Sequence, residues 1–144
     1  MNRKAMWQLT AGALVTACSL QFAWAAEPGL PPAQHAGAVT YLSGGVGSDQ
    51  SAAIKDAMHN YPLVLEFVGT TTHNGNEYLA DIPVRIADMH GNNVLNASAH
   101  GPFMLLSLPH GRYTITATHD GKTEQRAVNI ASATHAHEMF AWPM

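Results

Sequence analysis

Residues 103–118 read FMLLSLPHGRYTITAT, and this stretch decides the fold. Its apolar run, residues 103–108, ends at a Pro-His-Gly tripeptide, residues 109–111, whose composition is typical of a tight turn. After the turn, Tyr113 and Ile115 alternate with threonines, which is the period-two pattern of a strand with one buried face. The stretch predicts two β-strands joined by a turn. It also places Tyr113 on the inward side, with its hydroxyl within reach of a loop backbone.

The same pattern recurs along the chain at regular spacing. Apolar or alternating runs predict about seven short strands, at residues 63–68, 78–88, 94–98, 103–108, 112–118, 124–130 and 135–142. Asn74-Gly75 and Asp120-Gly121 are typical of tight hairpin turns. We therefore expect an all-β sandwich rather than an α/β fold.

The Asn74-Gly75 turn also predicts a register. A two-residue turn there would set Phe67 opposite Ile82, with further apolar pairs behind them. Pro83 cannot donate to a β-ladder, so its strand should be an edge there, or bulged. A longer loop with another register remains open.

The residues before the strands divide into three parts. Residues 1–25 have the basic start, the apolar run and the Ala-x-Ala end of a signal peptide. Residues 26–38 are rich in Pro and Gly and predict a flexible arm. Residues 39–61 predict a short strand, a glycine turn and one short helix from Ser48 to His59, capped by Ser48 or Asp49. Residues 62–142 form the predicted sandwich domain.

The leader predicts a periplasmic or secreted protein with no transmembrane helix in its mature part. Cys18 lies in a segment similar to a bacterial lipoprotein box, so anchoring through a lipid on Cys18 is the alternative. Cys18 is the single cysteine, and cleavage after Ala25 would leave none to form a disulfide.

Length and charge exclude several classes of protein. A chain of 144 residues is too short for a multidomain enzyme, and a net charge of −3 argues against a nucleic-acid partner. No Gly-x-Ser-x-Gly elbow, His-Glu-x-x-His motif or other catalytic constellation stands in the sequence, so we expect no enzyme activity. Nine histidines are many for this length.

Several segments carry a family resemblance. The runs IPVRI (82–86), GPF (101–103) and LPHGRYTI (108–115) resemble the carboxypeptidase-regulatory-like domains, which are transthyretin-like (prealbumin-like) β-sandwiches. The mature chain is also similar to small exported proteobacterial proteins that carry this domain. The resemblance covers residues 62–142 and implies an accessory binding or interaction module, with no peptidase activity. We expect no cofactor, with a copper, zinc or nickel ion as the alternative.

The sharpest local feature is the pair His135 and His137. Residues two apart on a strand point to the same side, so both imidazoles could reach one metal ion, and Met139 shares their parity. Copper, zinc or nickel would suit these ligands, while two solvated histidines are the simpler interpretation. Five other histidines flank turn glycines, and loops gathered at one end of the sandwich would bring them together: His73, His90, His100, His110 and His119.

The sequence thus supports two hypotheses. The first is an exported, non-enzymatic binding module whose partner is an unknown protein or small ligand. The alternative is a periplasmic protein that binds copper, zinc or nickel through surface histidines.

Overall fold

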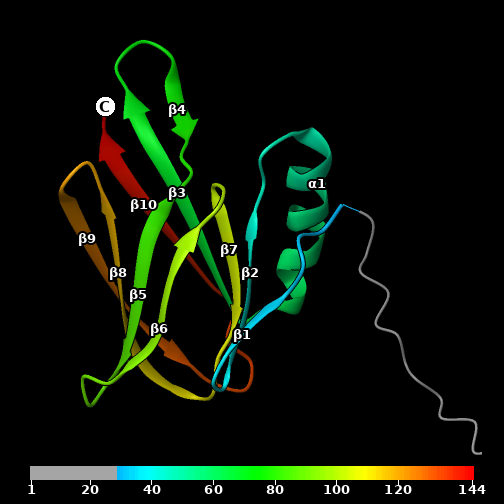
Figure 1. Cartoon of the computed structure of the whole chain (residues 1–144), viewed down its shortest axis with the longest axis vertical. Helices are drawn as coiled ribbons and strands as arrows, with labels where there is room; N and C mark the ends of the chain where they lie inside the picture. The colour runs from blue at the N-terminus through cyan, green and yellow to red at the C-terminus, as the bar shows by residue number, and fades with distance from the viewer. Residues whose placement is uncertain (1–28) are drawn as a thin grey trace, which may run out of the picture.

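The alternating strands pack as two sheets, face to face, with one helix on the outer surface of the first sheet (Figure 1). The computed structural model describes residues 29–144. The expected all-β sandwich is confirmed, with ten strands instead of seven. The signal peptide (1–25) and Cys18 lie outside the described residues.

The first sheet has the strand order β1-β2-β7-β3-β10, with β4 added beside β3. Its strands are β1 (Gln34–Ala36), β2 (Val39–Gly44), β3 (Leu63–Thr71), β4 (Gly75–Tyr78), β7 (Phe103–Ser107) and β10 (Ala136–Pro143). The second sheet has the order β6-β5-β8-β9. It consists of β5 (Ile82–Asp88), β6 (Asn93–Ala99), β8 (Gly111–His119) and β9 (Lys122–Ile130). All pairs are antiparallel except β3 with β10, which is parallel.

The inward faces of the two sheets form the main core. Phe67, Phe140 and Trp142 stack within it, with ring centroids 5.6–6.4 Å apart, and all three are almost completely buried. Tyr113 also points inward, and its hydroxyl donates a hydrogen bond to the Pro109 carbonyl at 2.7 Å. The prediction for Tyr113 is therefore confirmed. Burial, with Asp88 nearby, raises the pKa of Tyr113.

The predicted pairing of Phe67 with Ile82 is wrong. The run 78–88 does not form one strand, because it is divided between β4 in the first sheet and β5 in the second. Asp81 lies between them with a φ of 57°, at the point where the chain crosses from one sheet to the other. A sandwich must bury both inward faces, so this crossing brings Ile82 onto the opposing sheet.

The hairpin at Asn74-Gly75 exists with a longer loop. Thr71 pairs with Gly75, and Gly75 has a φ of 74°. The Thr71 hydroxyl accepts the Asn74 N–H at 3.1 Å and donates to the Gly75 carbonyl at 2.8 Å. The hairpin at Asp120-Gly121 has the predicted two-residue turn, with both residues at positive φ and His119 paired with Lys122.

Pro83 lies on β5, an inner strand of the second sheet, at a position where no hydrogen bond of the sheet is lost. β5 pairs with β6 along its length, but its pairing with β8 begins at Val84. The strand is therefore an edge at Pro83, as predicted, and no ladder bond is lost. The β-bulge lies further along, between Ile86 and Ala87.

The predicted helix is confirmed as α1 (Ser48–Ala57), followed by a short 3-10 turn, η1 (Met58–Asn60). Its N-cap is Gly47 with a φ of 90°, and no side chain caps it, so the prediction of Ser48 or Asp49 as the cap is wrong. The helix buries Ile54 and Ala57 against the outer face of the first sheet. Part of the predicted flexible arm is also ordered, because residues 34–36 form β1 against β2.

Candidate functional site

The two sides of the sandwich differ in how they are closed. On the side bordered by β9 and β10, which we call the closed side, the two strands lie next to each other (Figure 1). The Trp142 indole N–H donates to the Lys122 carbonyl at 3.0 Å. The Arg126 guanidinium lies 3.4 Å from the Met139 carbonyl and 5.1 Å from the centre of the Phe140 ring. Side chains of both sheets therefore seal this side.

The opposite side, bordered by β2 and β6, is the open side. The two sheets meet at one end of it, where the buried Ser43 hydroxyl accepts the His100 N–H at 3.0 Å. Gly101 packs so closely there that a Cβ atom would lie 2.4 Å from the Gly44 backbone. Beyond this contact the sheets separate, and a groove of about 500 Å³ lies between the proline-containing arm, β2 and β6.

The groove is lined by uncharged hydrogen-bonding groups and a few apolar ones. Its walls include Pro31 and Pro32 from the arm, Tyr41 from β2, Asn96 and Ser98 from β6, and His100. No Asp, Glu, Lys or Arg is among its described lining residues. The helix fixes one wall, because the Gln50 side chain accepts the Gly45 N–H at 2.8 Å. This lining suits an uncharged ligand that offers hydrogen bonds.

The predicted metal ligands lie on the outer face of the first sheet, on the opposite border from the groove. His137 and Met139 are exposed on β10, and His135 directly precedes the strand. His135 and His137 line one hollow of about 250 Å³ together with His59 and Tyr61, which follow the helix. Met139 is not part of that lining. Burial raises the pKa of Tyr61 in the wall of this hollow.

A carboxylate lies beside one imidazole of this hollow, although Glu66 is not among the residues that line it. Glu66 Oε2 lies 2.9 Å from His137 Nε2, and the Glu66 side chain is only 12% exposed. When Nε2 donates to this carboxylate, Nδ1 of His137 remains free as a ligand atom. In residues 29–144, however, no three His, Cys, Asp or Glu side chains lie close enough together to hold a metal ion.

Sequence reasoning missed His59 and Glu66 as neighbours of His137. They come together because β10 pairs in parallel with β3, setting Met139 beside Glu66, and because the helix ends over the same face. The available signal was that Glu66 is the single charged residue in the apolar run 63–68.

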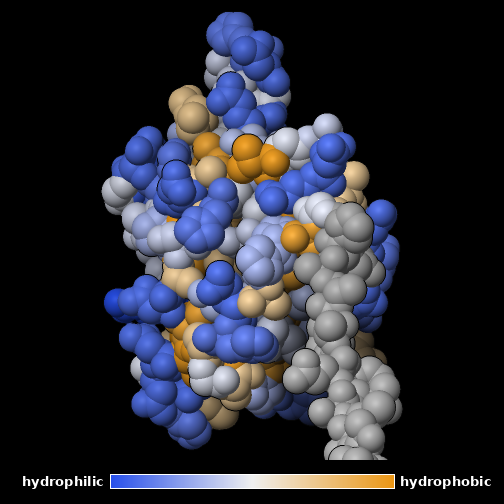
Figure 2. Space-filling model, turned by 45° about the vertical axis from the view of Figure 1, so that its right-hand side comes forward, coloured by the Kyte–Doolittle hydropathy of each residue, from blue (hydrophilic) through white to orange (hydrophobic). Residues whose placement is uncertain are grey.

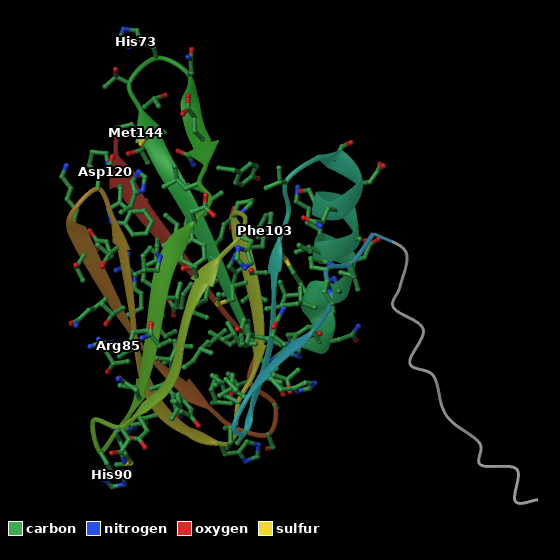
Figure 3. The ribbon with its side chains drawn as sticks, viewed as in Figure 1. His73, Arg85, His90, Phe103, Asp120 and Met144 are labelled. Carbon is green, nitrogen blue, oxygen red and sulfur yellow. The ribbon has the colours of Figure 1, made fainter. Side chains whose placement is uncertain are left out.

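The turn histidines do not gather at one end of the sandwich. Figure 3 shows His73 at the tip of the β3–β4 hairpin and His90 at the opposite end of the molecule. His100 borders the groove, while His119 packs on Trp142 with ring centroids 5.7 Å apart. The hairpin tip that carries His73 is hydrophilic and projects above the body of the protein (Figure 2).

Comparison with known proteins adds little to this description. No protein-family profile matches the chain, and no curated protein matches it. One solved structure with local similarity is the TIE protein of Bacillus anthracis, with 18% identity over 57% of this chain and 16% of that chain, and a TM-score of 0.40. None of the helices in residues 29–144 is long and apolar enough to cross a membrane.

Proposed function

We propose that this chain is a non-enzymatic binding module whose ligand lies in the groove on the open side. The observation that carries the proposal is the groove itself, about 500 Å³ in volume and lined by Tyr41, amide and hydroxyl side chains, and prolines. Such a site binds by shape and hydrogen bonds, and among its described lining residues only Tyr41 and His100 carry titratable side chains. The resemblance of residues 62–142 to carboxypeptidase-regulatory-like domains supports the same proposal.

Screening by NMR tests this function. Isotope-labelled protein is titrated with peptide and oligosaccharide panels, and the expected result is shifted amide signals around Tyr41 and His100. Tyr41→Ala should weaken binding about tenfold. Tyr78→Ala is the matched control, since Tyr78 is a half-exposed tyrosine on β4 outside the groove. Signals that shift only elsewhere, or turnover of ester, peptide or ureide substrates, would overturn the proposal.

We propose export as the setting for this binding, on the basis of residues 1–25. Mass spectrometry of the protein recovered from bacterial periplasm is expected to give a mature chain starting at Ala26. A lipid-modified N-terminus at Cys18 would instead identify a lipoprotein. An uncleaved chain in the cytoplasm would reject both.

Metal binding is a second candidate function, favoured by the shared hollow of His59, His135 and His137 and by the carboxylate of Glu66 beside His137. A carboxylate orients a metal-binding imidazole and increases its basicity. The hollow would hold copper, zinc or nickel after side-chain rotation, with Met139 as a further ligand for copper.

Calorimetry with each metal separates this function from the first. We expect stoichiometric uptake that is lost in the double variant His135→Ala/His137→Ala and retained in His73→Ala, whose histidine lies on the distant hairpin tip. Equal uptake by both variants would eliminate this site. Groove binding would be unaffected by either result.

A further inference from the structure

The outer strands of the two sheets are not equally protected. β1 has only three residues and follows two prolines, Pro31 and Pro32, which have no N–H to donate. β10 faces β9, its Met139 carbonyl lies against Arg126, and it ends at Pro143. Short length, proline and charged side chains are the usual means of preventing edge strands from pairing with other chains.

β6 has none of these protections. It consists of seven residues, NVLNASA, without Pro or any charged side chain, and among the described residues it pairs only with β5. β9 lies against the closed side, so β6 is the long edge of the sandwich that is left open.

The register shows which backbone groups of β6 are free. The Asp88 N–H donates to the Asn92 carbonyl, so the even-numbered residues of β5 direct their N–H groups toward β6. Val84 therefore exchanges hydrogen bonds with Ala97, whereas the pairs Arg85–Asn96 and Pro83–Ser98 exchange none. Pro83 has no N–H to donate, and it occupies one of the pairs that exchange no hydrogen bonds, as this alternation requires.

The N–H and C=O groups of Asn96 and Ser98 thus point away from β5. Both residues also line the groove, so their backbone groups border a space that is not filled by the protein. On the far wall, the arm presents Pro31 and Pro32, which cannot donate hydrogen bonds to a strand lying in the groove. A strand seated there has its hydrogen-bond partners on β6.

We propose that the groove binds an extended, uncharged peptide segment that adds to the second sheet as a strand beside β6. This inference rests on the proposed binding function and names the ligand class. Main-chain hydrogen bonds to Asn96 and Ser98 would supply affinity, and Tyr41 and Val46 on the wall would contact alternate side chains. A charged peptide is disfavoured, because the described lining residues include no Asp, Glu, Lys or Arg to pair with it.

The test removes one backbone donor from β6. Ser98→Pro deletes the N–H that points to the groove, and the ladder with β5 does not use that N–H. Ser98→Ala is the matched control, since it removes the hydroxyl and keeps the N–H. The probe is a bead library of uncharged octapeptides, and selected peptides are measured by calorimetry with the full chain. We expect a loss of tenfold or more for Ser98→Pro and less than twofold for Ser98→Ala.

A second variant and a second readout keep the test decisive. Asn96→Pro acts at the other free position if Ser98→Pro does not fold. In the wild-type protein, a bound peptide should slow amide hydrogen exchange at Asn96 and Ser98 by tenfold or more.

Strand addition would be overturned if no peptide is selected, if all variants bind peptide with equal affinity, or if the protein dimerises through β6 and Ser98→Pro abolishes the dimer. Binding of a neutral oligosaccharide that depends on Tyr41 but not on the Ser98 N–H would also overturn it, while the binding function itself would stand.

Discussion

The closed and open sides of the sandwich differ in how the edges of the two sheets are joined. Each side is a place where two sheets end next to each other. At the closed side, Trp142 and Arg126 extend from one sheet to backbone carbonyls of the other, at 3.0 and 3.4 Å. At the open side, one serine–amide hydrogen bond and one glycine contact join the sheets at a single end, and a groove remains.

The closed side should contribute mainly to the stability of the fold, and the open side to binding. Large aromatic side chains at the closed side contribute buried apolar area, which is the main source of folding free energy. The open side leaves polar groups accessible around a groove, which is where binding sites are usually found. Variants on the closed side should therefore change stability, and variants in the groove should change binding.

The largest effect is expected from Trp142→Ala. The side chain is 1% exposed and stacks on Phe67 and Phe140, so its removal leaves a cavity and should lower the free energy of unfolding by about 3–5 kcal/mol. Urea denaturation measures this. Trp142→Phe keeps a ring but loses the bond to the Lys122 carbonyl, and it should cost less. A loss below 1 kcal/mol for Trp142→Ala would show that the closed side does not carry the stability.

Gly101→Ala should be the most damaging small change at the open side. Its new Cβ would lie 2.4 Å from the Gly44 backbone, so the two segments must separate, at a cost of about 1–3 kcal/mol. Gly44→Ala is the comparison, because its Cβ would meet side-chain atoms, Gln50 Oε1 at 2.6 Å and Pro31 Cγ at 2.7 Å, instead of the backbone. Denaturation curves should show the larger loss of unfolding free energy for Gly101→Ala. A larger loss for Gly44→Ala would show that the contact between Gly101 and the Gly44 backbone is not as close as described.

Ser43→Ala should weaken the same end without a clash. It removes the acceptor of the His100 N–H, and such a bond contributes about 0.5–1.5 kcal/mol. Faster amide exchange at His100 should accompany the loss. Ser107→Ala, at an exposed serine on β7, should leave both measurements unchanged.

Arg126→Ala should open the closed side to other chains more than it destabilises the fold. The contact with the Phe140 ring should contribute about 0.5–1 kcal/mol, since the Arg126 side chain is still 34% exposed. Its larger effect should be concentration-dependent association, since the Met139 carbonyl on the β10 edge is uncovered. Sedimentation velocity checks this, with Arg126→Lys as the variant that keeps the charge. A strictly monomeric Arg126→Ala protein would show that Arg126 does not protect this edge.

The smallest effect is expected at Asp88, in the turn that leads into β6. Hydrogen bonds from the Asn92 and His90 N–H groups lower the pKa of this carboxyl. A lowered pKa stabilises the folded state above the usual value of about 3.9, and this stabilisation is lost as pH falls through the lower, folded-state value. The difference in urea midpoint between wild type and Asp88→Asn should be constant from pH 7 to 5 and shrink at pH 3. If the difference in urea midpoint instead grew as the pH fell, Asp88 would not stabilise the folded state through a lowered pKa.

Local patterns were sufficient for elements whose partners are adjacent in sequence. The Asp120-Gly121 turn, the strands around it, the inward Tyr113 and the helix were all predictable, because turn chemistry and side-chain period act within a few residues. The predicted pairing of Phe67 with Ile82 was wrong because it depended on contacts between distant parts of the chain. It depended on whether the chain stays in one sheet, and the crossing at Asp81 was decided by the need to cover both sheets.

The candidate site shows the same division. His135 and His137 were chosen by spacing alone, and the structure places both on one hollow, whereas His59 and Glu66 join them only through the parallel pairing of β3 and β10. The groove had no sequence signal, since Tyr41 and Ser98 are ordinary residues far apart in the chain.

The sequence by itself determined the helix and most of the strands with their inward faces, because apolar periodicity and turn residues are local properties. It did not predict β1 or the separation of β4 from β5. Tertiary structure alone decided which edges of the two sheets are sealed and which one is left open. That outcome depends on contacts such as Trp142 with Lys122 and Ser43 with His100, which join residues 20 and 57 positions apart. No local pattern encodes a distance across the sandwich, so only the folded chain shows where a ligand could enter.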